Sequence, residues 1–457
     1  MHFLGPRLVV AGTHSGVGKT TVATGLMAAL GRRGRVVAAA KVGPDFIDPG
    51  YHALATGRPG RNLDIWMCGA GAVGPLAARA AAGADLLVVE GVMGLFDGAA
   101  MAGPPSSTAD VAALLGAPVV LVVDAAGLSG SVAALVSGYA RWCTATRVAG
   151  VVLNQVGSDS HETMLRAALE PVGIPVLGVL RRDDTFAWRD RHLGLVPVVE
   201  DQAGVRRSLD ALAAAIEAGC DLDALEALAR SAPSQAVASP PEALPAGRAR
   251  VAVLGGRGFS FTYPDNLELL EQAGAELVAV DPESDRRLPP GINALYAGGG
   301  FPEVFAAGLA ANRSLLDDVG RQVGAGLVTW AECGGLLWLA RSLDGHPMAG
   351  AVPTDAHLTS RLTLGYRRVV PATDTPLGPA GTELRGHEFH YSRLEPAGMA
   401  LEWSGREGKG RFGFASPTLF ASYLHVHLAS DPAVAERFVA GAGGTTIPGA
   451  ATFGKPV

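Results

Sequence analysis

Short, mostly apolar runs alternate with helix-like segments through the N-terminal half of the chain. The apolar runs cover residues 7–12, 35–41, 84–91, 118–125, 148–155 and 175–180. The helix-like segments between them include residues 19–30, 108–116 and 131–142. Strands that are apolar on both faces and joined through helices form parallel sheets with both faces covered. The sequence therefore predicts an α/β fold built on a parallel sheet.

A second series of the same kind follows a stretch rich in Pro, Ala and Ser. This stretch, residues 231–248, shows no periodicity and indicates an interdomain linker. The apolar runs of the second series cover residues 250–256, 275–282, 294–300 and 326–335. We therefore predict a first α/β domain at 1–230, a linker at 231–248, a second α/β domain at 249–445 and a tail at 446–457.

Composition excludes several classes of protein. Hydrophobic residues make up 48% of the 457 residues and charged residues 18%, which supports large buried cores rather than disorder. The net charge of −6, without a long basic run, argues against a nucleic-acid partner. The cysteines are widely spread and form no CxxC pair, as expected in the reducing cytoplasm. No apolar run is long enough for a signal peptide or a membrane span, so we expect a cytoplasmic protein without a membrane partner.

The first chemical motif is GTHSGVGKT at residues 12–20, between a predicted strand and a predicted helix. The backbone N–H groups of such a loop bind phosphate oxygens. Lys19 is placed to reach the β- and γ-phosphates, and the hydroxyl of Thr20 is placed to bind Mg²⁺. The strict pattern has Gly at position 13, where this chain has Thr. We predict that the nucleotide contacts Thr13, Gly16, Val17, Gly18, Lys19 and Thr20.

Two neighbouring strand ends carry further charged residues. In LLVVEGVMGLFDG, Glu90 ends an apolar strand, where P-loop enzymes hold Mg²⁺, and Asp97 follows in a Gly-flanked loop. In KVGPDFIDPGYH, Lys41 could stabilise a transferring phosphoryl group, and Asp45 could bind a metal or orient a substrate. Asp48 in the same segment is equally well explained as a turn residue before proline.

The motif WAECGGL indicates a nucleophile in the second domain. Cys333 lies between an apolar strand and an apolar helix, where a sharp turn exposes the thiol and the helix N-terminus favours the thiolate. The N–H of Gly334 can bind an oxyanion, as in a nucleophile elbow. A second strand-end turn, YAGGGFPE, contains Gly299 and Gly300 and could supply the other oxyanion donor. We interpret the other three cysteines as core residues.

A cysteine nucleophile needs a base, and histidines follow in two segments. In YLHVH, strand alternation would put His425 and His427 on the same face, so we expect only one of them to be catalytic. In RGHEFHYS, the side chains His387, Glu388 and His390 resemble part of a metal site. No fourth ligand has suitable spacing, so we predict a packing or interface role for this segment.

These motifs together resemble the family of cobyrinic acid and hydrogenobyrinic acid a,c-diamide synthases, from about residue 7 to about residue 436. The resemblance implies a dethiobiotin-synthetase-like ATPase domain followed by a class I, triad-type glutamine amidotransferase domain. It implies a glutamine-hydrolysing carbon–nitrogen ligase of cobalamin biosynthesis that uses ATP and Mg²⁺. The c- and then the a-acetate of the corrinoid would be phosphorylated and then amidated. Cys333 and His425 would release the ammonia from glutamine.

The resemblance also assigns roles to single residues. Asp45, Glu90 and Asp97 match acidic positions of the synthetase site, and Thr20, Asp45 and Glu90 would be the metal ligands. Asn154 matches a strand-end asparagine that contacts adenine. Class I enzymes usually carry His-x-Glu, whereas this chain has His427 at the third position, which leaves the group that orients the catalytic histidine open.

The expected partners are small molecules: a corrinoid polycarboxylate, L-glutamine and ATP. If the chain self-associates, a homodimer is the commonest form. The closest alternatives are cobyric acid synthase and nickel-sirohydrochlorin diamide synthase, and the motifs do not distinguish cobalt-free from cobalt-loaded substrate. An alternative of another class is a P-loop nucleotide switch with an inactive amidotransferase domain.

Overall fold

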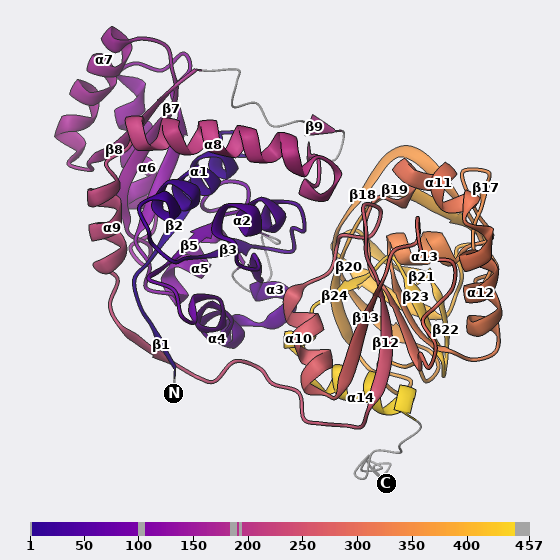
Figure 1. Cartoon of the computed structure of the whole chain (residues 1–457). Helices are drawn as coiled ribbons and strands as arrows, with labels where there is room; N and C mark the ends of the chain where they lie inside the picture. The colour runs from indigo at the N-terminus through magenta and orange to yellow at the C-terminus, as the bar shows by residue number, and fades with distance from the viewer. Residues whose placement is uncertain (1, 99–105, 183–189, 192–193, 444–457) are drawn as a thin grey trace. The chain divides into compact units, whose positions relative to one another are not determined.

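The structure of this chain is a computed structural model that describes residues 2–98, 106–182, 190–191 and 194–443 (Figure 1). The predicted tail at 446–457 lies outside the described residues. The chain divides into two compact units, residues 1–241 and 242–457. Along the described ranges, no helix combines the length and the apolar character that crossing a lipid bilayer would need.

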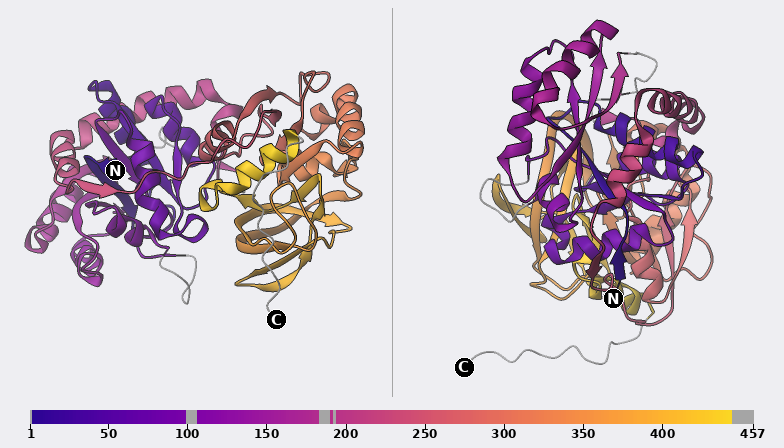
Figure 2. Two further views of the ribbon diagram at one scale, coloured as in Figure 1. Left: turned by 90° about the horizontal axis from the view of Figure 1, so that it is seen from below. Right: turned by 90° about the vertical axis from the view of Figure 1, so that its left-hand side faces the viewer.

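Unit 1 is built on a seven-stranded parallel sheet with the order β4-β3-β5-β2-β6-β7-β8. Its strands are β2 (Arg7–Gly12), β3 (Val37–Val42), β4 (Arg61–Leu63), β5 (Leu86–Glu90), β6 (Val119–Asp124), β7 (Val148–Val156) and β8 (Val176–Arg181). Nearly every residue of the central strands is buried, because helices lie on both sides of the sheet (Figure 2). The predicted α/β fold is confirmed, and all strands end at one edge, where the motif residues follow them.

The helices of unit 1 connect these strands. They are α1 (Lys19–Arg32), α2 (Asp48–Thr56), α3 (Ile65–Cys68), α4 (Ala70–Ala81), α5 (Thr108–Leu114), α6 (Ser131–Trp142), α7 (Asp159–Leu169), α8 (Gln202–Gly219) and α9 (Leu222–Arg230). Apolar residues of α1, α8 and α9 form one core cluster with alternate residues of β2, β3, β5 and β6. A short antiparallel pair, β9 (Asp190–Arg191) and β10 (Gly194–Leu195), precedes α8.

The predicted linker is partly ordered structure. Residues of β11 (Gln235–Val237) pair antiparallel with β1 (His2–Leu4) at the start of the chain. Arg7 is fully buried and donates hydrogen bonds to the carbonyl oxygens of Leu115 and Pro233, which ties this segment to the first unit. A Pro-rich composition therefore marks the end of unit 1, yet half of the stretch belongs to that unit.

Unit 2 contains a six-stranded sheet with the order β13-β12-β14-β15-β23-β22. Its strands are β12 (Ala249–Leu254), β13 (Ala275–Val280), β14 (Ala294–Ala297), β15 (Val328–Glu332), β22 (Phe414–Ser416) and β23 (Leu419–Ser422). All neighbours are parallel except β22 and β23. Its helices are α10 (Pro264–Gln272), α11 (Ala306–Ala311), α12 (Arg313–Gly324), α13 (Gly334–Leu339) and α14 (Ala433–Gly443).

A second sheet of unit 2 is largely antiparallel and was not predicted. Its strands are β16 (Ser342–Leu343), β17 (His346–Pro347), β18 (Asp355–Pro371), β19 (Leu384–Glu395), β20 (Leu401–Gly405), β21 (Gly408–Phe412) and β24 (His425–Val426). The long strands β18 and β19 pair with each other, and β19 pairs with β24 through His387 and His425. The second sheet thereby brings the RGHEFHYS segment next to the histidine that follows β23.

Candidate active sites

The phosphate loop of unit 1 turns sharply between β2 and α1. Gly16 and Gly18 both adopt positive φ, 84° and 93°, and Gly18 caps the N-terminus of α1. The ammonium of Lys19 lies over the loop and donates a hydrogen bond to the carbonyl oxygen of His14 at 3.0 Å. Burial, followed by the charge of Lys41, lowers the pKa of Lys19 to about 8. The loop thus holds a cation that anionic phosphate oxygens would stabilise.

Charged side chains form a buried cluster beside this loop, at the carboxyl ends of β3 and β5. Glu90 Oε1 accepts hydrogen bonds from the Thr20 hydroxyl at 2.6 Å and from Lys41 Nζ at 2.8 Å. The other Glu90 oxygen lies 2.6 Å from His52 Nε2. Asp48 Oδ2 lies 2.6 Å from Lys41 Nζ and 3.4 Å from the Thr20 hydroxyl. The structure therefore brings three predicted residues together with Asp48 and His52.

Burial and charge oppose each other in this cluster. Burial lowers the pKa of Lys41, but Asp48 and Glu90 outweigh it and raise that pKa above its usual range. Burial, together with Asp45, raises the pKa of Asp48 well above its usual range. Burial also acts to raise the pKa of Glu90, yet Lys41 and His52 reverse this and hold it below the usual range. The cluster therefore keeps a charged lysine against an ionised Glu90.

The acidic residues of the KVGPDFIDPGYH segment divide differently from the prediction. Asp45 Oδ1 accepts hydrogen bonds from the backbone N–H of Ile47 at 2.7 Å and of Asp48 at 3.1 Å, so it shapes the turn into α2. The carboxylate that reaches Thr20 is that of Asp48, for which the sequence left a turn role open. His52 was not predicted. Its position four residues after Asp48 on one helix face was the available signal.

The loop after β5 is tied to the phosphate loop. Asp97 Oδ2 accepts a hydrogen bond from the backbone N–H of Gly94 at 2.8 Å, and Phe96 stacks on Tyr139 with ring centroids 5.6 Å apart. The hydroxyl of Tyr139 donates to the carbonyl oxygen of Thr13. Asp97 thus shapes its own loop, and the aromatic pair connects that loop to the nucleotide-binding turn.

Asn154 also supports the phosphate loop. Its side-chain amide donates a hydrogen bond to the carbonyl oxygen of Val17 at 2.9 Å. A Cβ at Gly18 would overlap that amide, which explains why glycine occupies the position. The side-chain amide that was predicted to contact adenine therefore also holds the phosphate loop through this hydrogen bond.

The nucleophile elbow of unit 2 is strained. Cys333 follows β15 with φ 45° and ψ −102°, a conformation that a residue with a Cβ rarely adopts. Its N–H donates to the carbonyl oxygen of Ser422 at 2.8 Å, and 4% of the residue is exposed. Burial, followed by the charge of Glu303, raises the pKa of the Cys333 thiol, while the N–H of Gly334 acts to lower it. The predicted effect of the helix N-terminus is present, but desolvation outweighs it.

The glycines expected to form the oxyanion hole lie around this elbow. The backbone N–H of Gly299 already donates to the carbonyl oxygen of Phe261 at 3.1 Å, which differs from the prediction that it serves an oxyanion. A Cβ at Gly334 would lie 2.9 Å from the backbone nitrogen of Gly300, so the YAGGGFPE turn packs against the start of α13.

His425 and His427 do not share surroundings, contrary to the prediction from strand alternation. His425 Nδ1 lies 3.7 Å from Glu332 Oε2, and a Cβ at Gly299 would overlap the His425 ring. His427 Nδ1 accepts a hydrogen bond from the N–H of Ala429 at 3.3 Å. The alternation fails because β24 ends at residue 426, so His427 begins a 3₁₀ turn instead. Only His425 borders the elbow.

The RGHEFHYS segment packs closely along β19. The His387 ring lies against Tyr366 and Phe389, Glu388 pairs with Arg367 at 3.2 Å, and His390 stacks on Tyr423 with ring centroids 3.5 Å apart. Burial lowers the pKa of His387 to about 3 and that of His390 to about 4. Within the part of the chain that the structure describes, no group of three or more His, Cys, Asp or Glu side chains could hold a metal ion.

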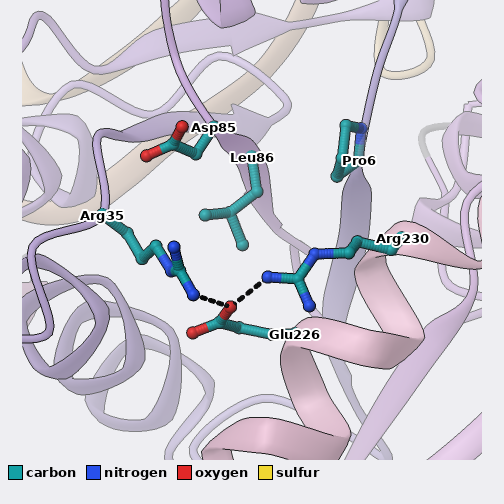
Figure 3. A pocket seen from close by; sticks show the side chains of 6 residues that line it. All are labelled: Pro6, Arg35, Asp85, Leu86, Glu226 and Arg230. Carbon is teal, nitrogen blue, oxygen red and sulfur yellow. Dashed lines mark hydrogen bonds and ion pairs between the residues drawn. The ribbon is translucent and has the colours of Figure 1, made fainter.

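Figure 3 shows a cavity of unit 1 that contains none of the motif residues. Its lining residues are Pro6, Arg35, Asp85, Leu86, Glu226 and Arg230. The first four lie at the amino ends of β2, β3 and β5, which is the edge of the sheet opposite to the phosphate loop, and Glu226 and Arg230 lie on α9. The carboxylate of Glu226 is buried between the guanidinium groups of Arg35 and Arg230, so its charge is already paired. We interpret this cavity as structural.

Known proteins resemble both halves of this chain. Residues 8–195 match the family model of the CobQ/CobB/MinD/ParA nucleotide binding domain, and residues 250–433 match that of the CobB/CobQ-like glutamine amidotransferase domain. A hydrogenobyrinate a,c-diamide synthase of Streptomyces coelicolor is 50% identical over 95% of this chain and 97% of its own length. A protein of the same name from Thermobifida fusca is 47% identical over 95% and 96%. A cobyrinate a,c-diamide synthase of Syntrophotalea carbinolica is 44% identical over 95% and 98%.

Proposed function

This chain belongs to the family of hydrogenobyrinate and cobyrinate a,c-diamide synthases, and we propose that it amidates the a- and c-acetate groups of such a corrinoid with ATP and glutamine. The observation that carries the proposal is the presence, on one chain, of a phosphate loop and a cysteine elbow, each at a strand-to-helix turn. The first suits activation of a carboxylate, and the second suits release of ammonia from an amide. A nucleotide switch would have no use for the second.

Unit 1 would transfer the γ-phosphoryl group of ATP to a corrinoid carboxylate. A carboxylate is a poor electrophile, and phosphorylation gives it a leaving group that ammonia can displace. The phosphate loop and Lys19 would bind the nucleotide phosphates, and Lys41 would stabilise the transferring group. The products of this step are ADP and an acyl phosphate, which ammonia converts to an amide and phosphate.

The charged cluster has the chemistry that Mg²⁺ requires. Mg²⁺ prefers oxygen ligands, commonly one or two carboxylates together with substrate phosphates. The hydroxyl of Thr20 and the carboxylates of Glu90 and Asp48 meet within hydrogen-bond distance, so these three side chains would hold the ion. We therefore propose Asp48 as a metal ligand in addition to the predicted Asp45, whose carboxylate is bonded to backbone N–H groups. A bound Mg²⁺ would neutralise charge that develops on the phosphate oxygens.

Unit 2 would hydrolyse glutamine through a thioester. His425 takes the proton of the Cys333 thiol as sulfur bonds to the amide carbon, and the proton then passes to the nitrogen as the C–N bond breaks. The N–H groups of Gly300 and Gly334, on turns that pack against each other, would donate hydrogen bonds to the oxyanion. Water then releases glutamate and restores the thiol. The base is necessary because burial keeps the free thiol protonated at neutral pH.

The relatives suggest an order of preference between the two corrinoids. The hydrogenobyrinate enzymes are 47–50% identical to this chain, whereas the cobyrinate enzymes are 40–44% identical. We therefore propose that the cobalt-free substrate is preferred. Assembly as a homodimer is a separate proposal that rests on the frequency of such dimers. Light scattering checks it by comparing the solution mass with the 46.6 kDa of one chain.

An assay of three products tests the proposal. Purified protein with Mg-ATP and glutamine is incubated with hydrogenobyrinate, with cobyrinate or without corrinoid, and ADP, glutamate and the corrinoid mass are measured. We expect corrinoid-dependent ADP release and a product that carries two new amides, formed faster from hydrogenobyrinate. ATP turnover that ignores both corrinoids would contradict the proposed substrate. A product with amides at other side chains would instead indicate the cobyric acid synthase alternative.

A further inference from the structure

We propose that Glu332, the residue immediately before the nucleophile, is the carboxylate that positions His425. The inference rests on the proposed glutamine hydrolysis and names a residue for which neither the motifs nor the relatives supply a role. The usual position of the orienting acid, two residues after the catalytic histidine, is His427 in this chain. A Cys–His pair without an acid leaves the imidazole free to rotate and to adopt the wrong tautomer. A carboxylate beside the His425 imidazole would prevent both.

The geometry points to Glu332. Its Oε2 lies 3.7 Å from His425 Nδ1, and the exposed fractions of the two side chains are 1% and 2%. At such burial a carboxylate and an imidazolium interact far more strongly than in water. The ring nitrogen that lies 3.7 Å from Glu332 is Nδ1, so in the proposed reaction Nε2 would exchange the proton with the thiol. Thiol, imidazole and carboxylate would then act as a nucleophile–base–acid triad, with the acid supplied from β15.

The Glu332 carboxylate is itself fixed. Its Oε1 accepts a hydrogen bond from the backbone N–H of Val426 at 2.9 Å, next to the histidine in sequence. Its Oε2 accepts a hydrogen bond from the hydroxyl of Tyr296 at 3.2 Å, and the Tyr296 ring stacks on Trp330 at 4.2 Å. A buried anion that is held by two donors keeps one orientation. Such support is what a positioning residue needs.

The other charged groups near this site have different partners. His427, at the usual acid position, accepts a hydrogen bond from Ala429 N–H, and its Nε2 lies 4.0 Å from Asp265 Oδ2. Glu388 on β19 pairs with Arg367 at 3.2 Å. His387, opposite His425 in the β19–β24 pair, is kept neutral because burial lowers its pKa to about 3. Glu303 helps to raise the pKa of the Cys333 thiol.

The proposed role of Glu332 is positional. The carboxylate stays ionised while His425 takes the thiol proton and returns it to the departing ammonia, and no proton moves to Glu332. Loss of the charge should therefore lower the rate of thioester formation and leave glutamine binding nearly unchanged. Amide formation from added ammonia needs neither Cys333 nor His425, so it should not change.

The test compares two buried histidine–carboxylate pairs of unit 2. The variants Glu332→Gln and Glu332→Asp are assayed beside Asp265→Asn, which alters the pair that involves His427. Glutamate release gives kcat and KM for glutamine, and amide formation with ammonium chloride reports the synthetase reaction. For Glu332→Gln we expect a loss of about 10²-fold in kcat, the lower end for a positioned base, and a KM within about threefold of wild type. Glu332→Asp should retain part of the activity, and Asp265→Asn should match the wild type.

A second variant covers the case in which Glu332→Gln does not fold. Tyr296→Phe removes one hydrogen bond to the carboxylate and keeps the ring stacked on Trp330. We expect it to lower kcat for glutamine several-fold while the ammonia-dependent rate stays unchanged. Glutamate release that is unaffected in both Glu332→Gln and Tyr296→Phe would overturn the inference, and so would an equal loss in Asp265→Asn. If no corrinoid is amidated by any form, the proposed function fails, while glutamate release still decides the role of Glu332.

Discussion

The two units differ in the charge that surrounds their reactive residues, although both residues lie on similar turns. Each places its reactive residue on a turn from the end of a parallel strand into a helix. In unit 1 the turn faces a buried ion pair, since Lys41 Nζ lies 2.8 Å from Glu90 Oε1. In unit 2 the thiol is buried and protonated, and its charge must be created during attack. Phosphoryl transfer uses charges already in place, whereas thiol chemistry depends on a well-placed base.

The backbone shows the same contrast. The residue at the helix N-terminus has positive φ in both turns, 93° at Gly18 and 45° at Cys333. Glycine adopts this conformation without a Cβ clash, and the phosphate loop needs no side chain there. Cysteine must accept the strain, which costs about 1–3 kcal/mol, because the reacting atom is on its side chain. The strain at Cys333 therefore supports a role for the thiol.

The largest effect should come from Cys333→Ala, which breaks one side of the comparison only. Without the sulfur no thioester can form, so glutamine-dependent amide formation should fall by at least about 10⁴-fold, as for removal of other covalent nucleophiles. Amide formation with ammonium chloride should remain within about twofold of wild type, because the phosphate loop is untouched. Cys143→Ala, outside the motifs, is the matched control. Normal glutamine use by Cys333→Ala would refute the assignment of the nucleophile.

Glu90→Gln should break the other side. It keeps the shape of the side chain but removes the charge that faces Thr20, Lys41 and His52. We expect a loss of about 10²–10³-fold in ADP release, with glutamine and with ammonia alike, as for removal of one electrostatic contact to a transition state. Glu226→Gln, which also alters a buried and paired glutamate of unit 1, should retain the wild-type rate (Figure 3). A loss confined to the glutamine reaction would contradict this division between the units.

Local patterns in the sequence were enough to predict the parallel sheets but not the antiparallel one. The strands of the parallel sheets are apolar on both faces, which makes them visible as continuous runs. Strand β18 (Asp355–Pro371) mixes buried, half-buried and exposed residues, and its pairing with β19 shifts register between Leu358 and Thr363. The sequence of β18 therefore shows neither strict alternation nor a continuous apolar run, the two patterns that predict a strand. The pairing is specified by contacts with β19 and β20, which a single segment does not reveal.

The same distinction applies to the sites. Loop motifs located Lys19 and Cys333, because a turn with its flanking strand and helix is a local feature. Asp48 and His52 could be assigned to the site only from the fold. Asp48 contacts Thr20, and His52 contacts Glu90 once β3 pairs with β5. The WAECGGL motif contains Glu332 but predicts no role for it, because its partner His425 is about 90 residues away in sequence. The roles of these residues depend on contacts between segments that are distant in sequence, which a local motif does not show.

Two glycine substitutions, one in each unit, should cause losses of activity of intermediate size. A Cβ at Gly18 would overlap the Asn154 amide, and a Cβ at Gly299 would overlap the His425 ring. We expect Gly18→Ala to lower ADP release in every assay and Gly299→Ala to lower only glutamate release, each by about 10-fold to 10²-fold, since small displacements of catalytic groups cost this much. Gly173→Ala, with φ 75° and no atom within 4 Å of the added Cβ, controls for backbone strain alone. Identical defects in the first two variants would show that the units do not act separately.

The smallest effect concerns pH, and it separates the two units without a mutation. Burial, followed by Lys41, lowers the pKa of Lys19 to about 8, so this ammonium begins to lose its proton just above neutral pH. ATP phosphates favour the charged form, so nucleotide binding should take up a proton and weaken as the pH rises above about 8. The expected slope approaches a tenfold change in Kd per pH unit, the limit for one linked proton. Calorimetric titration with a non-hydrolysable ATP analogue between pH 7 and 9.5 measures this slope.

The same group predicts a change in stability of opposite sign. Its pKa is lower in the folded chain than the ordinary value of about 10.4, so the unfolded chain binds more protons between about pH 8 and pH 10. Unit 1 should therefore gain stability from Lys19 as the pH rises through this window, while its affinity for nucleotide falls. Lys19→Met removes the proton exchange and should flatten both trends in unit 1. It should leave the pH profile of glutamate release by unit 2 unchanged, because that profile depends on Cys333 and His425. A slope in nucleotide affinity that survives Lys19→Met would assign the proton uptake to the cluster around Lys41 instead.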